Sequence, residues 1–344
     1  MTRLEQLGWT STRAAAFAAL EGASGLVPGR VALEHNHIYR VFIEDREWLA
    51  EAAGRIKHQA TGRHELPAVG DWVAIRPDPR GDRAVIRAIL PRQSWFSRKA
   101  AGRETTEQVV AANVDIVLIV FGLDKGVNVR AIERYLVVAQ RSLARPVLVL
   151  NKVDLIEQTE EPLRLARAAA GTTPVHAVSS RTGAGLAELD QYLQPGATLA
   201  FLGPSGVGKS SIVNRLVGAE VLPTGEVRPW DARGRHTSVH RQLVLRHRGG
   251  VIIDTPGMRE LQLWDSEQGI AETFPDIEAL AADCRFRDCR HDREPGCAVK
   301  AAVESGQLDR GRYESFLKLQ AEQADMERRR QERELQPGKR KDRR

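Results

Sequence analysis

The chain is 344 residues long, 42% of them hydrophobic, with a net charge of +6 at pH 7 and three cysteines. This length predicts two or three domains, and no apolar run approaches the roughly 18 residues that cross a bilayer. The Ala-rich segment 14–20 is short, is flanked by charges and lacks a cleavage pattern, which excludes a signal peptide, so we expect a cytoplasmic protein without a membrane partner.

Residues 1–35 are mixed in character, and we treat them as an N-terminal extension with a short helix at 13–21 and a loop at 22–29. From His37 the hydrophobic period changes to two, which indicates strands. The expected strands are 38–43, 48–50, 71–75 and 84–89. Short strands between glycine turns predict a small closed β-barrel over residues 36–103, and the oligonucleotide-binding (OB) barrel is the commonest of that size.

Basic and aromatic side chains are interleaved in and just after these strands. They are Arg55, Lys57, His58, Arg63, Trp95, Arg98 and Lys99. This mixture suits RNA, because cations contact the backbone and aromatic rings stack on bases. A structural barrel with solvated charges is the alternative.

Near Ala111 the pattern becomes an alternation of strands and helices, which predicts an α/β domain over residues 104–264. The expected strands are 115–122, 146–150, 174–178, 199–202, 242–246 and 251–253, and the expected helices are 128–143, 161–170 and 185–193. The strand 115–122 is almost continuously apolar, as in a parallel sheet covered on both faces. Ligand-binding loops are therefore expected at the carboxyl ends of the strands.

One of these loops carries the tetrad Asn151, Lys152, Val153 and Asp154. A carboxylate at Asp154 accepts from two donors at once, and guanine offers N1–H and an exocyclic amino group on one edge. Adenine presents an acceptor there, so such a site would reject it. Ser179 and Ser180, after the next strand, are expected to support the base.

The strand 199–202 leads into a glycine-rich loop of the form G-x-x-x-x-G-K-S, followed by helical spacing. Its residues are Gly203, Pro204, Ser205, Gly206, Val207, Gly208, Lys209, Ser210 and Ser211. Backbone N–H groups of such a loop bind phosphate oxygens, the lysine neutralises the β- and γ-phosphates, and the Ser210 hydroxyl ligates Mg²⁺. A glycine turn that matches by chance is the alternative, and the flanking strand and helix argue against it.

Asp254 and Gly257 follow a further apolar strand with the spacing Asp-x-x-Gly. We expect Asp254 to hold Mg²⁺ through water and the Gly257 N–H to sense the γ-phosphate. The base tetrad precedes the phosphate loop, the reverse of ordinary GTPases, which indicates a circular permutation. Met258 follows Gly257, where many GTPases have a glutamine that orients the attacking water, so slow intrinsic hydrolysis is expected.

All the cysteines lie close together near the C-terminus, as Cys284, Cys289 and Cys297, with His291 among them. Three sulfurs and an imidazole form a closed tetrahedral set for structural zinc, and we expect a mostly helical zinc-binding domain at 265–320. Three buried inert thiols are the alternative. Residues 321–344 are expected to form a charged helical tail with a disordered end. Nine basic against four acidic residues in 326–344 point to a polyanion such as RNA, and a solvated, frayed helix end is the equally open alternative.

A barrel-like N-terminal region, a base motif before the phosphate loop, Gly-Arg-His-Thr at 234–237 and the Cys/His cluster together resemble the ribosome small-subunit-dependent GTPases. The similarity covers roughly residues 36–320. It implies a GTPase that checks late maturation of the small ribosomal subunit, is stimulated by that subunit and carries an OB barrel and a zinc domain. Thr237 matches the first-switch threonine of that family, which also contacts Mg²⁺, whereas Ser238 stands where a second threonine is common.

The remaining expectations concern the mechanism and its rivals. His236 is our candidate for positioning water, because an imidazole serves as a base near neutral pH; a contact to RNA or to another loop is equally open. The rival functions are a permuted GTPase that acts on the large subunit and an RNA-binding module with a structural nucleotide site. We expect GTP or GDP, Mg²⁺ and one Zn²⁺ as ligands, the small subunit and its rRNA as partners, and a monomer.

Overall fold

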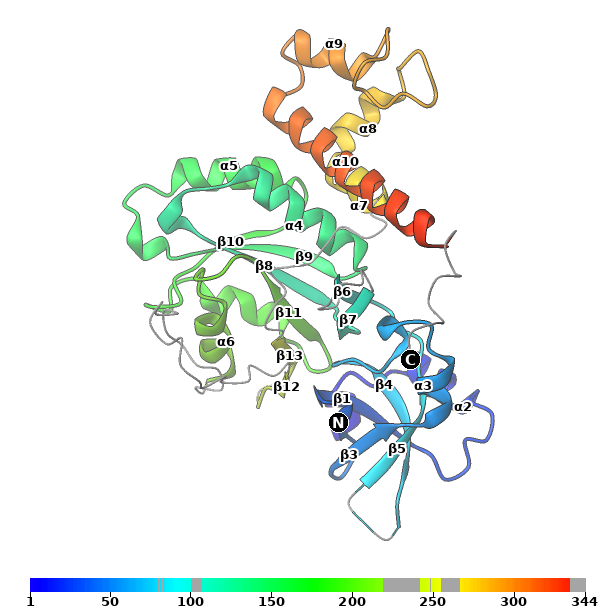
Figure 1. Cartoon of the computed structure of the whole chain (residues 1–344). Coiled ribbons are helices and arrows are strands. Elements are labelled where there is room, and N and C mark those ends of the chain that lie inside the picture. Colours follow the sequence, from blue (N-terminus) through cyan, green and yellow to red (C-terminus); the bar gives the residue numbers. More distant parts are fainter. Residues whose placement is uncertain are drawn as a thin grey trace, which may run out of the picture.

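The structure, a computed structural model, describes residues 1–79, 81, 83–99, 107–218, 242–247, 249–254 and 267–334. Figure 1 shows an N-terminal barrel, a central α/β domain and a helical C-terminal domain that lies against the α/β domain. Of the residues expected at the site, His236, Thr237 and Gly257 lie outside the described ranges, as does Met258.

The barrel is closed by five strands. They are β1 (Val27–His35), β2 (Ile38–Phe42), β3 (Glu47–Ala52), β4 (Trp72–Pro77) and β5 (Arg83–Ile89). β1 pairs with both β2 and β4, and β3 pairs in parallel with β5, which pairs with β4. Helix α3 (Gly54–Gln59) and the 3-10 turn η1 (Arg63–Glu65) connect β3 to β4. Closure leaves no free sheet edge, which is the architecture expected of an OB barrel.

The first strand differs from the expectation. Residues 22–29 were expected to be a loop and 1–35 an extension, yet β1 begins at Val27 and its residues 30–32 are buried. Its sequence continues after Val27 with Pro28 and Gly29, which are poor strand formers, so the period of two was hidden. A side chain at Gly29 would lie 2.5 Å from Val41, so the glycine permits close approach to β2. The barrel therefore begins before residue 36.

Two short helices and a hairpin surround the junction between the barrel and the α/β domain. The helices are α1 (Arg3–Gln6) and α2 (Ser11–Ala18), and the hairpin pairs β6 (Trp95–Lys99) with β7 (Glu107–Ala112). Leu7 is fully buried and Trp9 lies 4.9 Å from Trp72. The backbone N–H of Trp95 donates to the Ser142 carbonyl, so this residue belongs to the hairpin against the α/β domain rather than to the barrel.

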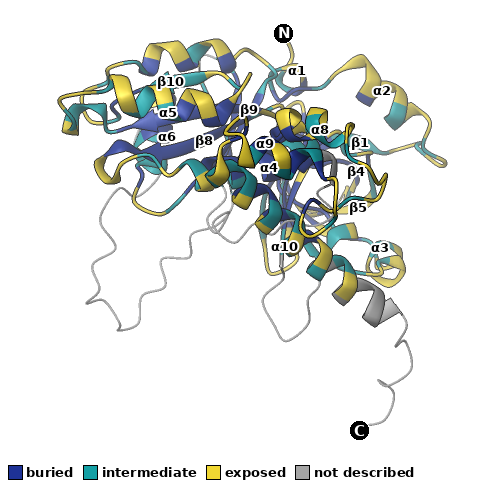
Figure 2. Cartoon of the chain, turned by 90° about the horizontal axis from the view of Figure 1, so that it is seen from above, coloured by how far each residue is buried: buried dark blue, intermediate teal, exposed yellow. Residues whose placement is uncertain are grey.

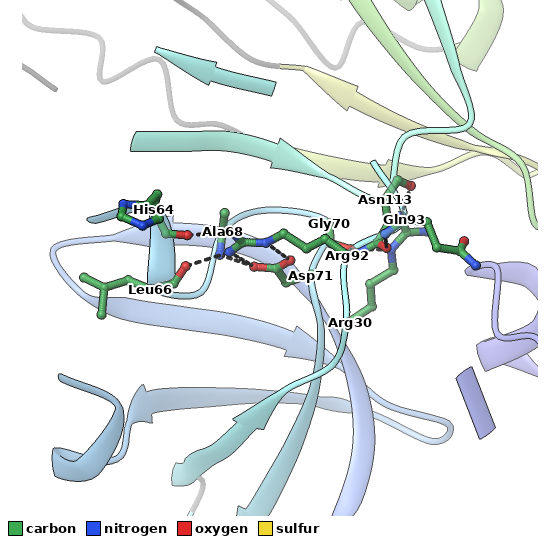
Figure 3. Close-up of polar contacts among 9 residues, drawn as sticks. All are labelled: Arg30, His64, Leu66, Ala68, Gly70, Asp71, Arg92, Gln93 and Asn113. Carbon is green, nitrogen blue, oxygen red and sulfur yellow. Dashed lines mark hydrogen bonds and ion pairs between the residues drawn. The ribbon is translucent and has the colours of Figure 1, made fainter. Parts of the chain in front are cut away.

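Arg30 of β1 connects these parts at the junction shown in Figure 3. Its guanidinium donates to the carbonyls of Leu7 and Asn113 and to the Thr198 hydroxyl, and its Nε donates to the Gly70 carbonyl. The side chain is fully buried, and burial lowers its pKa to about 9, which leaves it charged at neutral pH. Arg30 thus ties the N-terminal segment and the barrel to the strand that begins at Thr198.

The α/β domain is built on six strands, which lie in the sheet in the order β10-β9-β8-β11-β13-β12. The strands are β8 (Ile116–Gly122), β9 (Arg145–Asn151), β10 (Val175–Ala177), β11 (Thr198–Leu202), β12 (Gln242–Leu245) and β13 (Val251–Asp254). All neighbouring pairs are parallel except β12 with β13. β12 also meets β1 of the barrel at Leu33 and Gln242, so the two domains share one sheet.

Helices cover both faces of this sheet. Buried residues of α4 (Val129–Arg141) and α5 (Glu160–Ala170) pack with one set of strand residues, such as Ile119. Residues of α6 (Lys209–Val217) and of the 3-10 helix η4 (Leu186–Tyr192) pack with the alternate set, such as Leu118. The expected helix at 185–193 is therefore a 3-10 helix. Because successive side chains of a strand point to opposite faces of the sheet, these two sets of residues mark its two faces. Figure 2 shows the buried strands between exposed helix surfaces.

The C-terminal domain consists of α7 (Glu267–Thr273), α8 (Pro275–Ala281), α9 (Ala298–Glu304) and the long α10 (Arg310–Glu334). Arg312 of α10 is one of the residues that attach it to α4, because it donates to Glu133 there, as well as to Asp276 of α8, and lies over the Phe274 ring. Glu133 is fully buried on α4, and burial raises its pKa. Among the described helices, none is long and apolar enough to cross a membrane.

Candidate functional site

The phosphate loop leaves the carboxyl end of β11 and enters α6 at Lys209, as the sequence predicts. Gly203 has φ +131°, and a Cβ there would lie 2.1 Å from the Val120 carbonyl oxygen of β8. A Cβ at Gly208 would lie 2.3 Å from the Asn151 amide nitrogen. Both positions therefore require glycine, and the loop is built against β8 and the end of β9.

Lys209 and Asp254 lie near each other where the loop meets the end of β13. The Lys209 ammonium donates to the carbonyls of Gly203 (2.8 Å) and Pro204 (2.6 Å). Burial raises the pKa of the Asp254 carboxyl, and the charge of Lys209 opposes this shift. The half-buried carboxylate at the end of β13 and the Ser210 hydroxyl in the first turn of α6 are the kind of oxygen ligands that Mg²⁺ prefers, so these residues fit that ion chemically.

Asn151 joins the base tetrad to the loops on either side. Its amide nitrogen donates to the Val207 carbonyl (2.8 Å) and the Ser180 hydroxyl (3.1 Å), and its oxygen accepts from the Ser180 N–H (2.9 Å). Asn151 is fully buried. The structure therefore brings the tetrad, the Ser179–Ser180 loop and the phosphate loop to one edge of the sheet, although 52 residues separate Asn151 from Gly203.

Asp154 points its carboxylate at the loop that follows β10. Oδ1 accepts from the Ser179 hydroxyl, and Oδ2 accepts from Arg181 Nε at 2.8 Å. The Ser179 hydrogen bond and, after it, the charge of Arg181 hold the pKa of Asp154 below its usual value. The carboxylate is therefore ionised at neutral pH, the state that accepts from guanine.

Two further charged residues reach the site without having been identified from the sequence. Asp124 lies just after β8 and its Oδ2 is 2.8 Å from the Lys152 ammonium. Arg215 of α6 donates to the carbonyls of Ser180 and Arg181. Asp124 follows the carboxyl end of a buried strand, a signal that could have indicated its position. Arg215 lies in the last turn of α6, beyond the loop motif, and no sequence signal points to it.

The cysteine cluster is preformed. The ligand atoms of Cys284, Cys289, His291 and Cys297 all lie within 4.8 Å of one another. His291 Nδ1 is 3.5 Å from the sulfurs of Cys284 and Cys297, which are 3.9 Å apart. Tetrahedral zinc, with bonds of about 2.3 Å to sulfur and 2.0 Å to nitrogen, places its ligand atoms roughly 3.5–3.8 Å apart.

The backbone around the cluster fixes the imidazole. His291 has φ +63°, and the Tyr313 hydroxyl of α10 donates to its carbonyl at 2.6 Å. Burial works against ionisation of Cys284, but the backbone N–H groups of Val299 and Ala298 outweigh it and lower the pKa of this thiol. The four side chains therefore fit a structural Zn²⁺ with Nδ1 as the imidazole ligand.

Four of the basic residues expected to contact RNA lie in the segment that connects β3 to β4, whereas Arg98 and Lys99 lie on β6 of the hairpin. Arg55, Lys57 and His58 are exposed on α3, and Arg63 is exposed in η1. The aromatic rings of the described barrel strands are different, because Tyr39, Trp48 and Trp72 are all buried. Base stacking on these three rings is therefore unavailable, whereas Trp95 of β6, the ring expected to stack on bases, is 37% exposed.

Comparisons with known proteins agree with this geometry. A family model described as RsgA GTPase matches residues 89–264. A relative from Opitutus terrae named small ribosomal subunit biogenesis GTPase RsgA is 47% identical over 93% of this chain and 90% of its own length. A protein of the same name from Syntrophotalea carbinolica is 43% identical, covering 93% and 89%.

Two solved structures are similar over nearly their whole length. YjeQ from Thermotoga maritima has a TM-score of 0.62 at 31% identity, covering 86% of this chain and 97% of that one. The structure of YloQ, described as a circularly permuted GTPase, has a TM-score of 0.63 at 25% identity and covers 87% and 96%. The predicted order of base motif before phosphate loop is therefore that of a permuted GTPase fold.

Proposed function

Because this chain belongs to the RsgA GTPase family, we propose that it hydrolyses GTP on the small ribosomal subunit during the late maturation of that subunit. The observation that carries the proposal is the meeting of Asp154, the loop 203–211 and Asp254 at one edge of the sheet. The relatives' names specify the small subunit, which favours it over the large-subunit alternative.

Different groups of residues bind the base, the phosphates and the magnesium ion. Asp154 binds the guanine edge, while Asn151, Ser179 and Ser180 fix the loops around the base; Lys152 and Val153 line the same side. The backbone N–H groups of residues 203–211, apart from Pro204, and the Lys209 ammonium bind the phosphates. To reach them, Lys209 exchanges the Gly203 and Pro204 carbonyls for phosphate oxygens. Ser210, Asp254 and Thr237 would hold Mg²⁺, which neutralises charge on the β- and γ-phosphates.

Hydrolysis requires a water aligned with the γ-phosphate. Its oxygen bonds to phosphorus while the bond to the bridging β–γ oxygen breaks, giving GDP and phosphate. Gly257 contacts the γ-phosphate through its N–H, and Met258 has no group that orients the water. Either His236 or a ribosomal group positions it, so bound subunit completes the site.

The flanking domains transmit the nucleotide state. β12 pairs with the barrel at Leu33, and the segment after Asp254 leads into α7, which packs on α4. GTP would therefore order both connections and dock the barrel, α3 and the basic tail on rRNA, and hydrolysis would release the factor. The protein acts in the cytoplasm as a monomer.

Phosphate release measured with purified small subunits, large subunits and free rRNA tests this proposal. We expect strong stimulation by the small subunit alone, since completion of a GTPase site by a partner is worth about a thousandfold or more. Equal stimulation by both subunits would refute the small-subunit assignment. Nucleotide binding without turnover in any arm would favour the RNA-binding module instead.

A further inference from the structure

Arg181 contacts the carboxylate that reads the base, and it directly follows Ser180 in the loop after β10. Its Nε lies 2.8 Å from Asp154 Oδ2, and Asp154 is only 12% exposed while Arg181 is 73% exposed. The cation therefore approaches a largely buried acceptor from the solvent side.

The hydrogen bonds of this carboxylate can be counted. An ionised carboxylate has about four acceptor sites, two on each oxygen. Ser179 uses one on Oδ1 and Arg181 uses one on Oδ2. The backbone N–H of Asp154 itself also lies against the carboxylate. The two side-chain partners leave one site on each oxygen, and guanine offers two adjacent donors, N1–H and the exocyclic amino group.

The backbone of Arg181 is held in place, so its contact with Asp154 does not depend on a loose loop. Arg215 donates to the carbonyls of both Ser180 and Arg181, at 3.2 and 2.6 Å. The Thr182 N–H donates to the Ser179 hydroxyl at 3.0 Å. α6 therefore anchors the loop from which Arg181 reaches Asp154.

We propose that Arg181 is a specificity-determining positioning residue, which with Ser179 holds the Asp154 carboxylate so that one acceptor on each oxygen faces the base. A base with two donors gains from this fixed orientation, whereas a base with one donor gains less. Arg181 thereby favours guanine over hypoxanthine, which lacks the amino group. The inference rests on the proposed guanine site and adds a residue to it.

The test compares GDP and IDP affinities of the full-length protein, measured by calorimetry, for the wild type and Arg181→Ala. Exposed ion pairs contribute little, so we expect GDP binding to weaken by about fivefold and IDP binding by no more than about twofold. The preference for GDP over IDP then falls. Arg181→Lys, which keeps a cation that can donate to Asp154, should restore part of that preference.

Arg164→Ala is the matched control. Arg164 is an exposed arginine on α5 with an ion pair to Glu161 at 2.7 Å, so this variant loses the same charge away from the site. It should leave both affinities unchanged, and equal losses in the two alanine variants would reduce the effect to net charge and overturn the proposal.

Three other results would also overturn it. Equal weakening of GDP and IDP by Arg181→Ala would indicate that the guanidinium stacks on the purine. Tighter binding of GDP would indicate that Arg181 competes with the base for Asp154, and unchanged binding would leave it without a role. Asp154→Asn separates this inference from the guanine site itself: if that variant still prefers GDP over ADP, the site assignment fails, whatever Arg181 does.

Discussion

Replacing Arg30 by methionine should destabilise the junction between the barrel and the α/β domain. The substitution keeps an unbranched apolar stem under Trp72, over whose ring the guanidinium carbon lies at 5.4 Å, and removes the donors. The Gly70 carbonyl keeps the Asn113 side-chain amide as a donor at 3.1 Å. The Thr198 hydroxyl also loses the guanidinium, but a hydroxyl can rotate to another partner. The carbonyls of Leu7 and Asn113 lose it too and remain buried without a donor.

The magnitude follows from those two orphaned acceptors. Each buried polar group left unsatisfied costs about 1–3 kcal/mol, so the pair predicts a loss of roughly 2–6 kcal/mol in the free energy of unfolding. Removal of a buried charge offsets part of this cost, which places the expectation in the lower half of the range. That loss is still a large share of the roughly 5–15 kcal/mol that stabilises a typical domain.

Urea unfolding followed by tryptophan fluorescence provides the assay, because Trp9 and Trp72 lie together at the junction. Hydrogen exchange at the β1 amides should quicken in parallel. Arg40→Met, a neighbouring change on β2 whose arginine is half-exposed and 3.6 Å from Glu47, should cost less than about 0.5 kcal/mol. Equal midpoints for the two variants would refute the reasoning.

Further predictions concern the metal, the base and the switch. Cys297→Ser should lower the zinc content and the melting temperature of the C-terminal domain while GDP affinity stays at the wild-type value; full zinc stoichiometry would show that Cys297 is no ligand. Because Ser179 lowers the pKa of Asp154 and the ionised form binds guanine, Ser179→Ala should lose GDP affinity at a higher pH than the wild type as the pH falls from 7, and superimposable pH profiles would contradict this. His236→Ala should keep basal turnover and subunit binding but lose most stimulated turnover; normal stimulation would remove His236 from activation, and loss of subunit binding would make it a docking residue.

Local patterns predicted most of the elements and the nucleotide motifs. The strands of the α/β domain were found because buried parallel strands are continuously apolar, and the phosphate loop because its glycines and lysine have fixed spacing. β1 was not found, since Pro28 and Gly29 interrupt its alternation. The helix expected at 185–193 is a 3-10 helix, a distinction that hydrophobic spacing does not make.

The contacts that join distant segments could not be predicted. Arg30 donates to Thr198 across 168 positions, and Arg181 reaches Asp154 across 27. The sequence around an arginine does not indicate which hydrogen-bond acceptor the fold brings close to its side chain. Trp95 was predicted to belong to the barrel for the same reason. The residue that it contacts, Ser142, is distant in the sequence and belongs to the α/β domain.

The permuted strand order has a consequence for synthesis of the chain. β8 lies between β9 and β11 in the sheet, and Ile116 pairs with Leu199. At translation rates of roughly 5–20 residues per second, the apolar strand that ends at Gly122 waits about 4–15 s before Thr198 is made. For that interval one edge of β8 has no partner strand, which exposes a hydrophobic edge to aggregation. The half of the site that recognises the base is thus translated before the half that binds phosphate, so GTP cannot assist its folding and a chaperone at the nascent chain would have an apolar target.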